Sequence, residues 1–224
     1  MAVVISLGGS MVNPDGIPDA KFLKKMKALL KGKEKIGIVV GGGKIAREYV
    51  KAASDFSKAQ FWLDTMAIKA TRLNAALVAQ ALGEEACPSV FEDFEKAAQA
   101  SRQYKIVVMG GTVPGITTDT DSVLLAEAIG AKRVLNVSIV DGVYDSNPKT
   151  NPKAKKFGKL TYEKLLTLAN ESDKRTAGTN FVFDVVACKL AARSKLELHF
   201  VGEKNINEVP KALSGKAHKG TIVK

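Results

Sequence analysis

Three glycine-rich segments follow short apolar runs in this chain of 224 residues. They are Gly8-Gly9-Ser10, Gly41-Gly42-Gly43 and Gly110-Gly111-Thr112. Glycine lets a backbone approach a ligand closely, and the free N–H groups at a helix start attract phosphate. If the apolar runs are parallel strands, the three loops lie on one edge of a sheet, where ligands bind. The pattern therefore indicates a site for a ligand that carries several phosphates.

A candidate phosphate-binding cation lies one helical turn beyond the middle glycine segment. Arg47 follows Gly43 at a spacing that brings its guanidinium back to the helix start, where it can bind phosphate through two parallel hydrogen bonds. Lys44 is similarly placed, but its side chain could equally point to solvent. The first apolar run carries Ser6 where a lysine would be useful. We therefore expect Arg47 to bind phosphate and further positive charge to come from elsewhere.

The third glycine segment continues into a stretch rich in hydroxyl groups, GGTVPGITTDTDS at residues 110–122. Thr118 and Asp121 have the spacing of a capping box and predict a helix start. Asp119 is favourable in the first turn of that helix because of the helix dipole. The hydroxyl groups beyond those needed for the cap indicate that this loop contacts a substrate.

Two widespread nucleotide-binding motifs do not fit the chain. The middle glycine segment matches G-x-G-x-x-A, but Asp64, the acid at the required distance, does not end a strand. The G-x-x-x-x-G-K-[ST] loop is missing because Ile45 follows Gly43-Lys44. Neither of the two histidines lies near a nucleophile in sequence, which argues against a Ser-His-Asp enzyme.

Strands and helices alternate along the chain and must position these loops. The hydrophobic periodicity predicts strands at residues 2–7, 36–40, 86–90, 105–109, 133–140, 197–201 and 220–224, the last as a candidate edge strand. It predicts helices at residues 19–31, 43–54, 59–82 (as one or two), 92–101, 119–130, 161–170, 180–194 and 205–213, with an extended loop or hairpin at 141–160. Such alternation predicts an α/β three-layer sandwich, with a central, mainly parallel sheet between helices. Because the sequence shows no repeats and no long linker, we expect residues 1–224 to form a single domain.

Composition narrows the class of protein and its partners. The formal net charge is +11, which favours anionic ligands. Lysines gather at residues 149–159 and 211–224, and we interpret both groups as solvated faces; nucleic acid is not the expected partner, because aromatic residues are almost absent among them. No apolar run reaches membrane-spanning length and no signal peptide is recognisable, which predicts a cytoplasmic protein. Cys87 and Cys188 are expected to be buried, reduced thiols.

Four segments, taken in order, resemble the amino acid kinase family, and within it the archaeal type of uridylate kinases. They are LGGS near the start, VVGGGKIAR, the GGT-x-P-x-x-TTD loop and VDGVY-x-x-NP, and the match runs over essentially the whole chain. The resemblance implies ATP-dependent phosphorylation of UMP to UDP with Mg²⁺ and a homo-hexamer built from dimers. It also implies an acceptor half at residues 1–130 and an ATP-binding half at residues 131–224.

The resemblance also implies roles for individual residues. Those expected to bind ATP are Gly9, Ser10, Gly43, Arg47, Ser138, Ile139, Tyr144 and Asn147. Those expected to bind UMP are Gly42, Asp64, Thr112, Val113, Pro114, Gly115, Ile116, Thr117 and Thr118. The expected catalytic residues are Arg47, Asp119 and Asp184, and no side chain is predicted as a metal ligand.

Three positions depart from the family pattern. Many relatives carry a lysine at the position of Ser6, an aspartate at that of Asn147, and a more polar residue at that of Ile139. We hypothesise that Arg47, Mg²⁺ and another lysine (Lys44, or one within 149–159) replace the missing charge. Asp184 is open to two interpretations, an organising role near the site or a helix cap or structural ion pair.

Two alternative functions stay open at this point. One is another kinase of the same fold, which acts on a carboxylate, a carbamate or an isoprenoid phosphate. The other is a non-enzymatic protein that binds nucleotides or RNA, which the net charge would suit. Arg47 and the threonine-rich loop favour a nucleotide as the phosphate acceptor.

Overall fold

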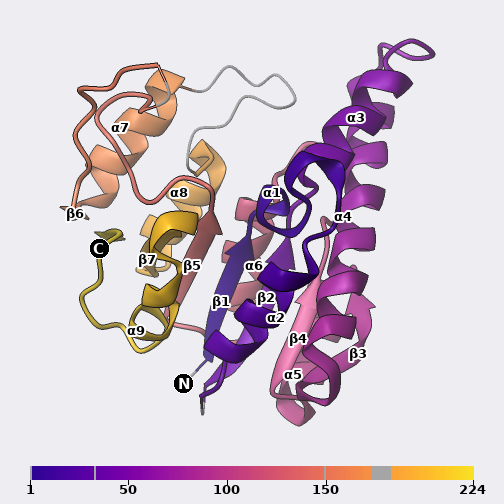
Figure 1. The fold of residues 1–224 in the computed structure, drawn as a ribbon, viewed down its shortest axis with the longest axis horizontal. Coiled ribbons are helices and arrows are strands. Elements are labelled where there is room, and N and C mark those ends of the chain that lie inside the picture. Colours follow the sequence, from indigo (N-terminus) through magenta and orange to yellow (C-terminus); the bar gives the residue numbers. More distant parts are fainter. Residues whose placement is uncertain (1, 33, 149, 173–182) are drawn as a thin grey trace.

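The computed structural model describes residues 2–32, 34–148, 150–172 and 183–224. Within these residues, eight strands form one sheet in the order β3-β4-β2-β1-β5-β7-β8-β6 (Figure 1). The strands are β1 (Ala2–Leu7), β2 (Lys35–Val40), β3 (Ala86–Phe91), β4 (Ile106–Met109), β5 (Arg133–Ser138), β6 (Lys159–Leu160), β7 (Glu197–Gly202) and β8 (Thr221–Val223). Only the β7–β8 pair among these is antiparallel. The predicted α/β fold with a mainly parallel central sheet is confirmed.

Helices cover both faces of the sheet (Figure 1). The α-helices in the described ranges are α1 (Gly9–Val12), α2 (Ala20–Leu29), α3 (Gly43–Ala53), α4 (Gln60–Leu82), α5 (Phe94–Gln103), α6 (Thr118–Ala128), α7 (Tyr162–Ser172), α8 (Val185–Arg193) and α9 (Val209–Leu213). The short 3₁₀ helices in the described ranges are η1 (Pro14–Gly16), η2 (Gly83–Glu85) and η3 (Glu203–Glu208).

The alternation of side chains along β1 divides the core into two layers. Ile5 and Leu7 are buried against α1, α2, α4 and α9, whereas Val4 is buried on the other face with α5 to α8. Ser6 shares the face of Val4, which turns its hydroxyl toward α6. The central strands are apolar on both faces because helices cover both.

Several element boundaries differ from the sequence prediction. The strand at 220–224 is not at the edge, because the two-residue β6 pairs with its outer side. The 59–82 segment is one helix, the strand predicted at 133–140 ends at Ser138, and the helix predicted at 205–213 begins as the 3₁₀ helix η3. Residues 141–160 include an antiparallel bridge between Tyr144 and Lys156, as expected for a hairpin.

Further outcomes concern the helix predicted at 180–194 and the two cysteines. Residues 180–182 of that predicted helix lie outside the described residues, and the described helix begins at Val185. Cys87 and Cys188 are buried and unpaired, as predicted. None of the described helices combines the length and apolarity needed to cross a membrane.

Candidate active site

The three glycine segments meet on one edge of the sheet because β4, β2 and β1 are adjacent and parallel. The first two segments touch backbone to backbone. A Cβ atom on Gly9 would lie 2.1 Å from the nitrogen of Gly43 and 2.4 Å from the oxygen of Gly41. Gly43 itself has a φ of +63°, in the left-handed region. Glycine is therefore required at both contact points, and the predicted convergence of the loops is confirmed.

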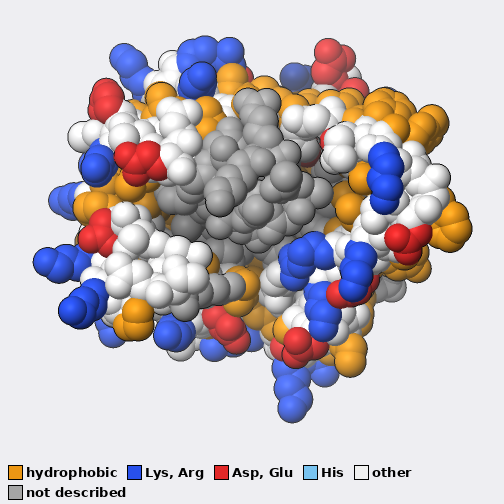
Figure 2. Space-filling view, turned by 90° about the horizontal axis from the view of Figure 1, so that it is seen from above, with side chains coloured by type: hydrophobic (Ala, Val, Ile, Leu, Met, Phe, Trp, Pro, Cys, Tyr) orange, Lys and Arg blue, Asp and Glu red, His pale blue; other side chains and the backbone are white. Residues whose placement is uncertain are grey.

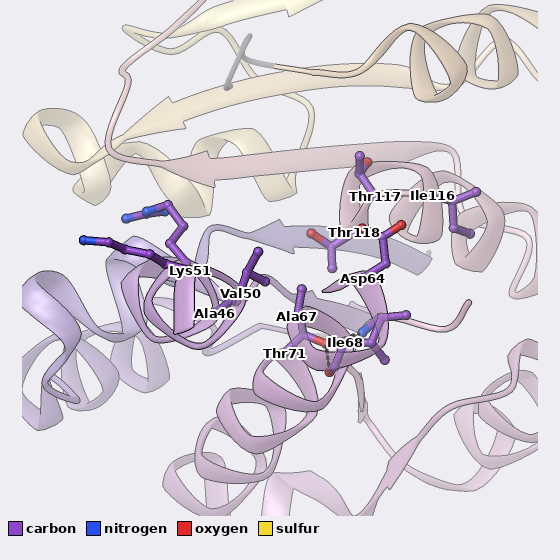
Figure 3. Close-up of a pocket in the computed structure, with 14 residues that line it drawn as sticks. Ala46, Val50, Lys51, Asp64, Ala67, Ile68, Thr71, Ile116, Thr117 and Thr118 are labelled. Carbon is purple, nitrogen blue, oxygen red and sulfur yellow. Dashed lines mark hydrogen bonds between the residues drawn. The ribbon is translucent and has the colours of Figure 1, made fainter. Parts of the chain in front are cut away.

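A cavity of about 530 Å³ opens beside these loops (Figure 3). One wall is α3, a second is α4, and a third is the loop that leads into α6. Its lining residues are Gly42, Gly43, Ala46, Arg47, Val50, Lys51, Asp64, Ala67, Ile68, Thr71, Gly111, Ile116, Thr117 and Thr118. The walls combine apolar side chains with cations, a carboxylate and hydroxyl groups, which suits a ligand that has both polar and apolar parts.

Arg47 supplies positive charge at the glycine end of the cavity. Its Nη2 atom lies 3.5 Å from the hydroxyl of Ser10, so it reaches from α3 to the exit of β1. Within the described residues, no carboxylate forms an ion pair with Arg47, whereas Lys44 lies 3.9 Å from Asp15. The guanidinium is thus available to an anionic ligand at the junction of the first two glycine segments.

The third glycine segment is anchored by side chains from α4. The N–H of Gly111 donates to Thr71 Oγ1 at 2.6 Å, and Arg72 donates to the carbonyls of Gly111 and Thr112, both at 3.0 Å. Arg72 also pairs with Glu92 at 2.6 Å. These bonds fix the loop over the cavity before any ligand arrives.

Asp121 is buried and accepts from both the N–H and the hydroxyl of Thr112, at 3.2 and 2.6 Å. Burial raises the pKa of Asp121 to about 6, although the two bonds from Thr112 oppose that shift. Thr112 does not line the cavity, and neither do Val113, Pro114 and Gly115. Their contact with a substrate therefore stays a prediction.

Thr117 caps α6, so the predicted capping box of Thr118 and Asp121 is wrong. The Thr117 hydroxyl accepts from the N–H groups of Asp119 and Thr120, at 3.2 and 3.3 Å. The reason is tertiary: Asp121 is occupied by Thr112 and cannot complete a box with Thr118. Thr118 is consequently left on the cavity wall.

Asp119 lies where α6 approaches the ends of β1 and β5. Its Oδ1 atom accepts from the hydroxyl of Ser6 at 2.7 Å and from Asn136 Nδ2 at 3.1 Å. Burial raises the pKa of Asp119 to about 7, the nearby charge of Asp184 adds to the rise, and the bond from Ser6 opposes it. Within the described part of the chain, no lysine or arginine pairs with Asp119.

The helix-cap interpretation of Asp184 is confirmed, and its organising role near the site stays a prediction. Its carboxylate caps α8 by accepting from the N–H groups of Val186 and Ala187, at 2.8 and 3.0 Å. It also accepts from the hydroxyls of Thr117 and Thr120, the latter at 3.0 Å. Asp184 therefore fixes the start of α8 against the start of α6, beside the cavity wall.

The residues expected to hold adenosine begin at Ser138, the last residue of β5. This strand lies beside the first glycine segment, where Gly8 donates to the carbonyl of Val137 at 2.8 Å. Tyr144 donates to Asp141 at 2.7 Å, and this bond raises the pKa of Tyr144 to about 12. Lys156 pairs with Asp141 at 2.8 Å, so that lysine of the 149–159 cluster is already engaged. The candidate replacement Lys149 lies outside the described residues.

Ser138, Ile139, Tyr144 and Asn147 do not line the cavity. Ser138 donates to the carbonyl of Val140 at 3.2 Å, and Ile139 is exposed. The backbone oxygen of Asn147 accepts from Asn151 at 2.9 Å, which shapes the loop after Tyr144. Their role in ATP binding stays a prediction from the resemblance.

Sequence reasoning missed several residues that build the site. Ile68 and Thr71 lie on the cavity wall together with Asp64, and their spacing of four and three residues on one helix face could have revealed them. The bond between Ser6 and Asp119 had no sequence signal, since the two residues are 113 positions apart.

Comparison with known proteins agrees with this architecture. Residues 1–202 match the model of the amino acid kinase family. A uridylate kinase from Thermococcus onnurineus is 42% identical over 226 aligned residues, which span 100% of this chain and 99% of the relative. A uridylate kinase from Archaeoglobus fulgidus is 39% identical over 223 residues and is covered completely.

Solved structures give the same result. The crystal structure of the uridylate kinase from Archaeoglobus fulgidus superposes with a TM-score of 0.87 at 36% identity, and all of both chains is covered. A UMP kinase from Bacillus anthracis superposes with a TM-score of 0.81 at 22% identity and covers 100% of this chain and 95% of that one. At that lower identity the second match supports only the assignment of the fold.

Proposed function

This chain belongs to the amino acid kinase family, and we propose that it is a uridylate kinase, which transfers the γ-phosphoryl group of ATP to UMP. The observation that carries this function is full-length similarity at about 40% identity to curated uridylate kinases. The cavity beside the glycine segments supports it, because phosphoryl transfer needs positioning and charge stabilisation rather than a covalent intermediate.

For UMP we propose the cavity between α3 and α4. Gly42, Thr117 and Thr118 line it, together with Arg47 from α3 and Asp64 from α4. Asp64 accepts from the N–H of Gly115 at 3.0 Å through one carboxylate oxygen, which leaves the other to accept from a ribose hydroxyl. The remaining proposed contacts are Thr112, Val113, Pro114, Gly115 and Ile116.

For ATP we propose the ends of β1 and β5. The phosphates would lie against Gly9, Ser10 and Gly43, with Arg47 between the donor and acceptor phosphates. Adenosine would lie against Ser138, Ile139, Tyr144 and Asn147. In this arrangement residues 1–130 mainly bind the acceptor and residues 131–224 mainly bind the donor.

Kinases of this family generally require a metal ion, and we propose Mg²⁺. The described residues contain no group of three or more acidic, histidine or cysteine side chains that could enclose a metal. Mg²⁺ does not need such an enclosure, because nucleotide phosphates and waters complete its shell around one or two carboxylates. Asp119 could supply one such carboxylate, because the bonds from Ser6 and Asn136 both go to its Oδ1 atom, and the ion would neutralise charge on the transferred group.

We further propose a cytoplasmic homo-oligomer, a hexamer assembled from dimers. Apolar side chains gather on the side of the molecule where α3 and α4 lie, at the right in Figure 2. Trp62 is 61% exposed and Phe61 57% exposed, and Tyr49 and Leu73 are also exposed. An exposed group of this kind supports a protein–protein contact along α4. Analytical ultracentrifugation of the wild type and of Trp62→Glu would test it.

The function is tested by mixing the purified protein with ATP, Mg²⁺ and each nucleoside monophosphate in turn, and by following ADP release. We expect rapid turnover with UMP. No turnover with any monophosphate would refute the proposal. Phosphorylation of a carboxylate, a carbamate or an isoprenoid phosphate would indicate another kinase of this fold. RNA binding that weakens steeply with salt, without turnover, would indicate the non-enzymatic alternative.

A further inference from the structure

We propose that Asn13 and Asn74 form a buried amide pair that positions the first two glycine segments for phosphoryl transfer. The two residues do not line the cavity and were not expected from the sequence. The inference rests on the proposed function, because it assigns them to the geometry of that reaction. Both act through the backbone of the loops, so they are positioning residues.

Every polar atom of the pair has a partner. Asn13 Nδ2 donates to Asn74 Oδ1 at 2.9 Å, and Asn74 Nδ2 donates to the carbonyls of Gly41 and Gly42, at 2.8 and 3.1 Å. Asn13 Oδ1 accepts from the N–H of Lys44 at 3.0 Å. The side chains are 0% and 2% exposed. Burying two amides is costly unless their bonds are satisfied, so the pair selects one arrangement of the loops.

The pair completes the start of α3. The residue at its N-cap is Gly42, which has no side chain to accept a hydrogen bond. Asn13 supplies the missing acceptor from another segment by binding the N–H of Lys44. A carbonyl and the N–H that follows it point in opposite directions in a trans peptide. Asn74 holds the carbonyls of Gly41 and Gly42, so the N–H groups of Gly42 and Gly43 point away from it.

The same pair connects the loop proposed to bind ATP with the loop proposed to bind UMP. Asn13 follows α1 directly, and its own N–H donates to the carbonyl of Gly9 at 2.8 Å. Gly9 belongs to the proposed ATP side and Gly42 to the proposed UMP side. A Cβ atom on Gly43 would lie 2.3 Å from Asn13 Oδ1, so the amide is packed directly against the second segment. The distance between the two loops is therefore fixed through Asn13.

Asn74 extends the connection to the third glycine segment. It lies on α4 three residues after Thr71, the acceptor for the N–H of Gly111. One helix face thus holds the second and third segments at a fixed separation. In-line transfer is sensitive to such separations, since a displacement of about 1 Å can lower a rate by about 100-fold.

The test compares Asn13→Ala, Asn74→Ala and the double variant with the wild type. We expect each single variant to lower kcat by about 10- to 100-fold, while KM for ATP and UMP changes less than about threefold. The double variant should lose little more than either single variant, because both residues act as one unit. Val78→Ala is the matched control: it creates a cavity on α4 one turn beyond Asn74, in the core, where Val78 is buried.

Val78→Ala should lower Tm and leave kcat within about twofold of the wild type. If folded Asn13→Ala and Asn74→Ala also keep kcat within about twofold, the proposal is wrong. It is equally wrong if kcat falls in Val78→Ala in proportion to Tm, because the role of the pair would then be structural only.

Hydrogen exchange of the wild type decides the matter if the alanine variants do not fold. The N–H of Lys44 lies in the first turn of α3, where amides normally exchange freely, and its bond to Asn13 predicts at least about 100-fold protection. Rapid exchange at Lys44 would overturn the proposal. This measurement needs no substrate. A failure of the proposed function would show separately, as a wild type that does not turn over UMP.

Discussion

Ser6 donates a hydrogen bond of 2.7 Å to Asp119, so the side chain that β1 places beside this buried carboxylate is a neutral hydroxyl. The bond stabilises the charged form of a carboxyl whose pKa burial raises to about 7. Asp119 therefore has a neutral partner in Ser6, and no lysine or arginine in the described part of the chain forms an ion pair with it. A cation bound with the nucleotides can then supply positive charge beside it.

Ser6→Ala should shift the acid limb of the pH–rate profile toward higher pH. A hydrogen bond to a charged group contributes about 1.5–3 kcal/mol, or about 1–2 pKa units. Turnover near neutral pH should therefore fall about tenfold if Asp119 acts as a carboxylate. Ser6→Thr keeps the hydroxyl and should restore the profile. An unchanged acid limb in Ser6→Ala would show that this bond does not control Asp119.

The sequence predicted the convergence of the glycine segments because parallel strands place their exits on one edge. It did not predict the partners of Ser6, Asn13 or Asn74, because these bonds join residues far apart in sequence. The cap of α6 was predicted at the wrong residue because it, too, depends on a tertiary contact. Local spacing favoured Thr118, but Thr112 occupies Asp121, and this contact depends on the folded loop.

Asp119→Asn should stabilise the protein at alkaline pH while lowering turnover by at least about 100-fold. The folded pKa of Asp119 is about 7 and its unfolded value is 3.8. Between these values the folded state holds more protons, so Asp119 lowers the free energy of unfolding as pH rises from about 4 to 7. Urea denaturation should show Asp119→Asn more stable by roughly 2 kcal/mol at pH 8 and little changed at pH 4. Equal differences at both pH values would contradict this origin.

Arg47→Ala should lower kcat/KM for UMP by about 100- to 1,000-fold, because Arg47 has no carboxylate partner in the described residues and is free to bind phosphate. Arg47→Lys keeps the charge but loses the bidentate geometry, so its activity should lie between that of the wild type and that of Arg47→Ala. Lys44→Ala is the comparison that tests whether Lys44 shares this task. A loss equal to that of Arg47→Ala would show that both cations are needed.

Arg72→Met should raise KM for UMP about tenfold and change KM for ATP much less. Arg72 holds the carbonyls of Gly111 and Thr112, so its removal frees the loop over the acceptor cavity. Steady-state kinetics with each substrate varied in turn would measure both constants. Glu92→Gln removes only the exposed partner of Arg72 and should have a small effect. Equal rises in both KM values would mean that the loop serves both substrates.

His199 should make the protein less stable as pH falls. Its contribution to the pH dependence of the free energy of unfolding has the opposite sign to that of Asp119. His199 is buried in β7, with Nδ1 at 3.0 Å from His218, and burial lowers its pKa from 6.5 to about 4. Between these values the unfolded state binds more protons, so the free energy of unfolding falls as pH drops from about 6.5 to 4. The two slopes partly cancel in the wild type. His199→Gln should remove one of them, so that its stability relative to the wild type rises by about 1 kcal/mol or more between pH 6.5 and 4.5. A stability difference that does not change with pH would show that folding does not lower the pKa of His199.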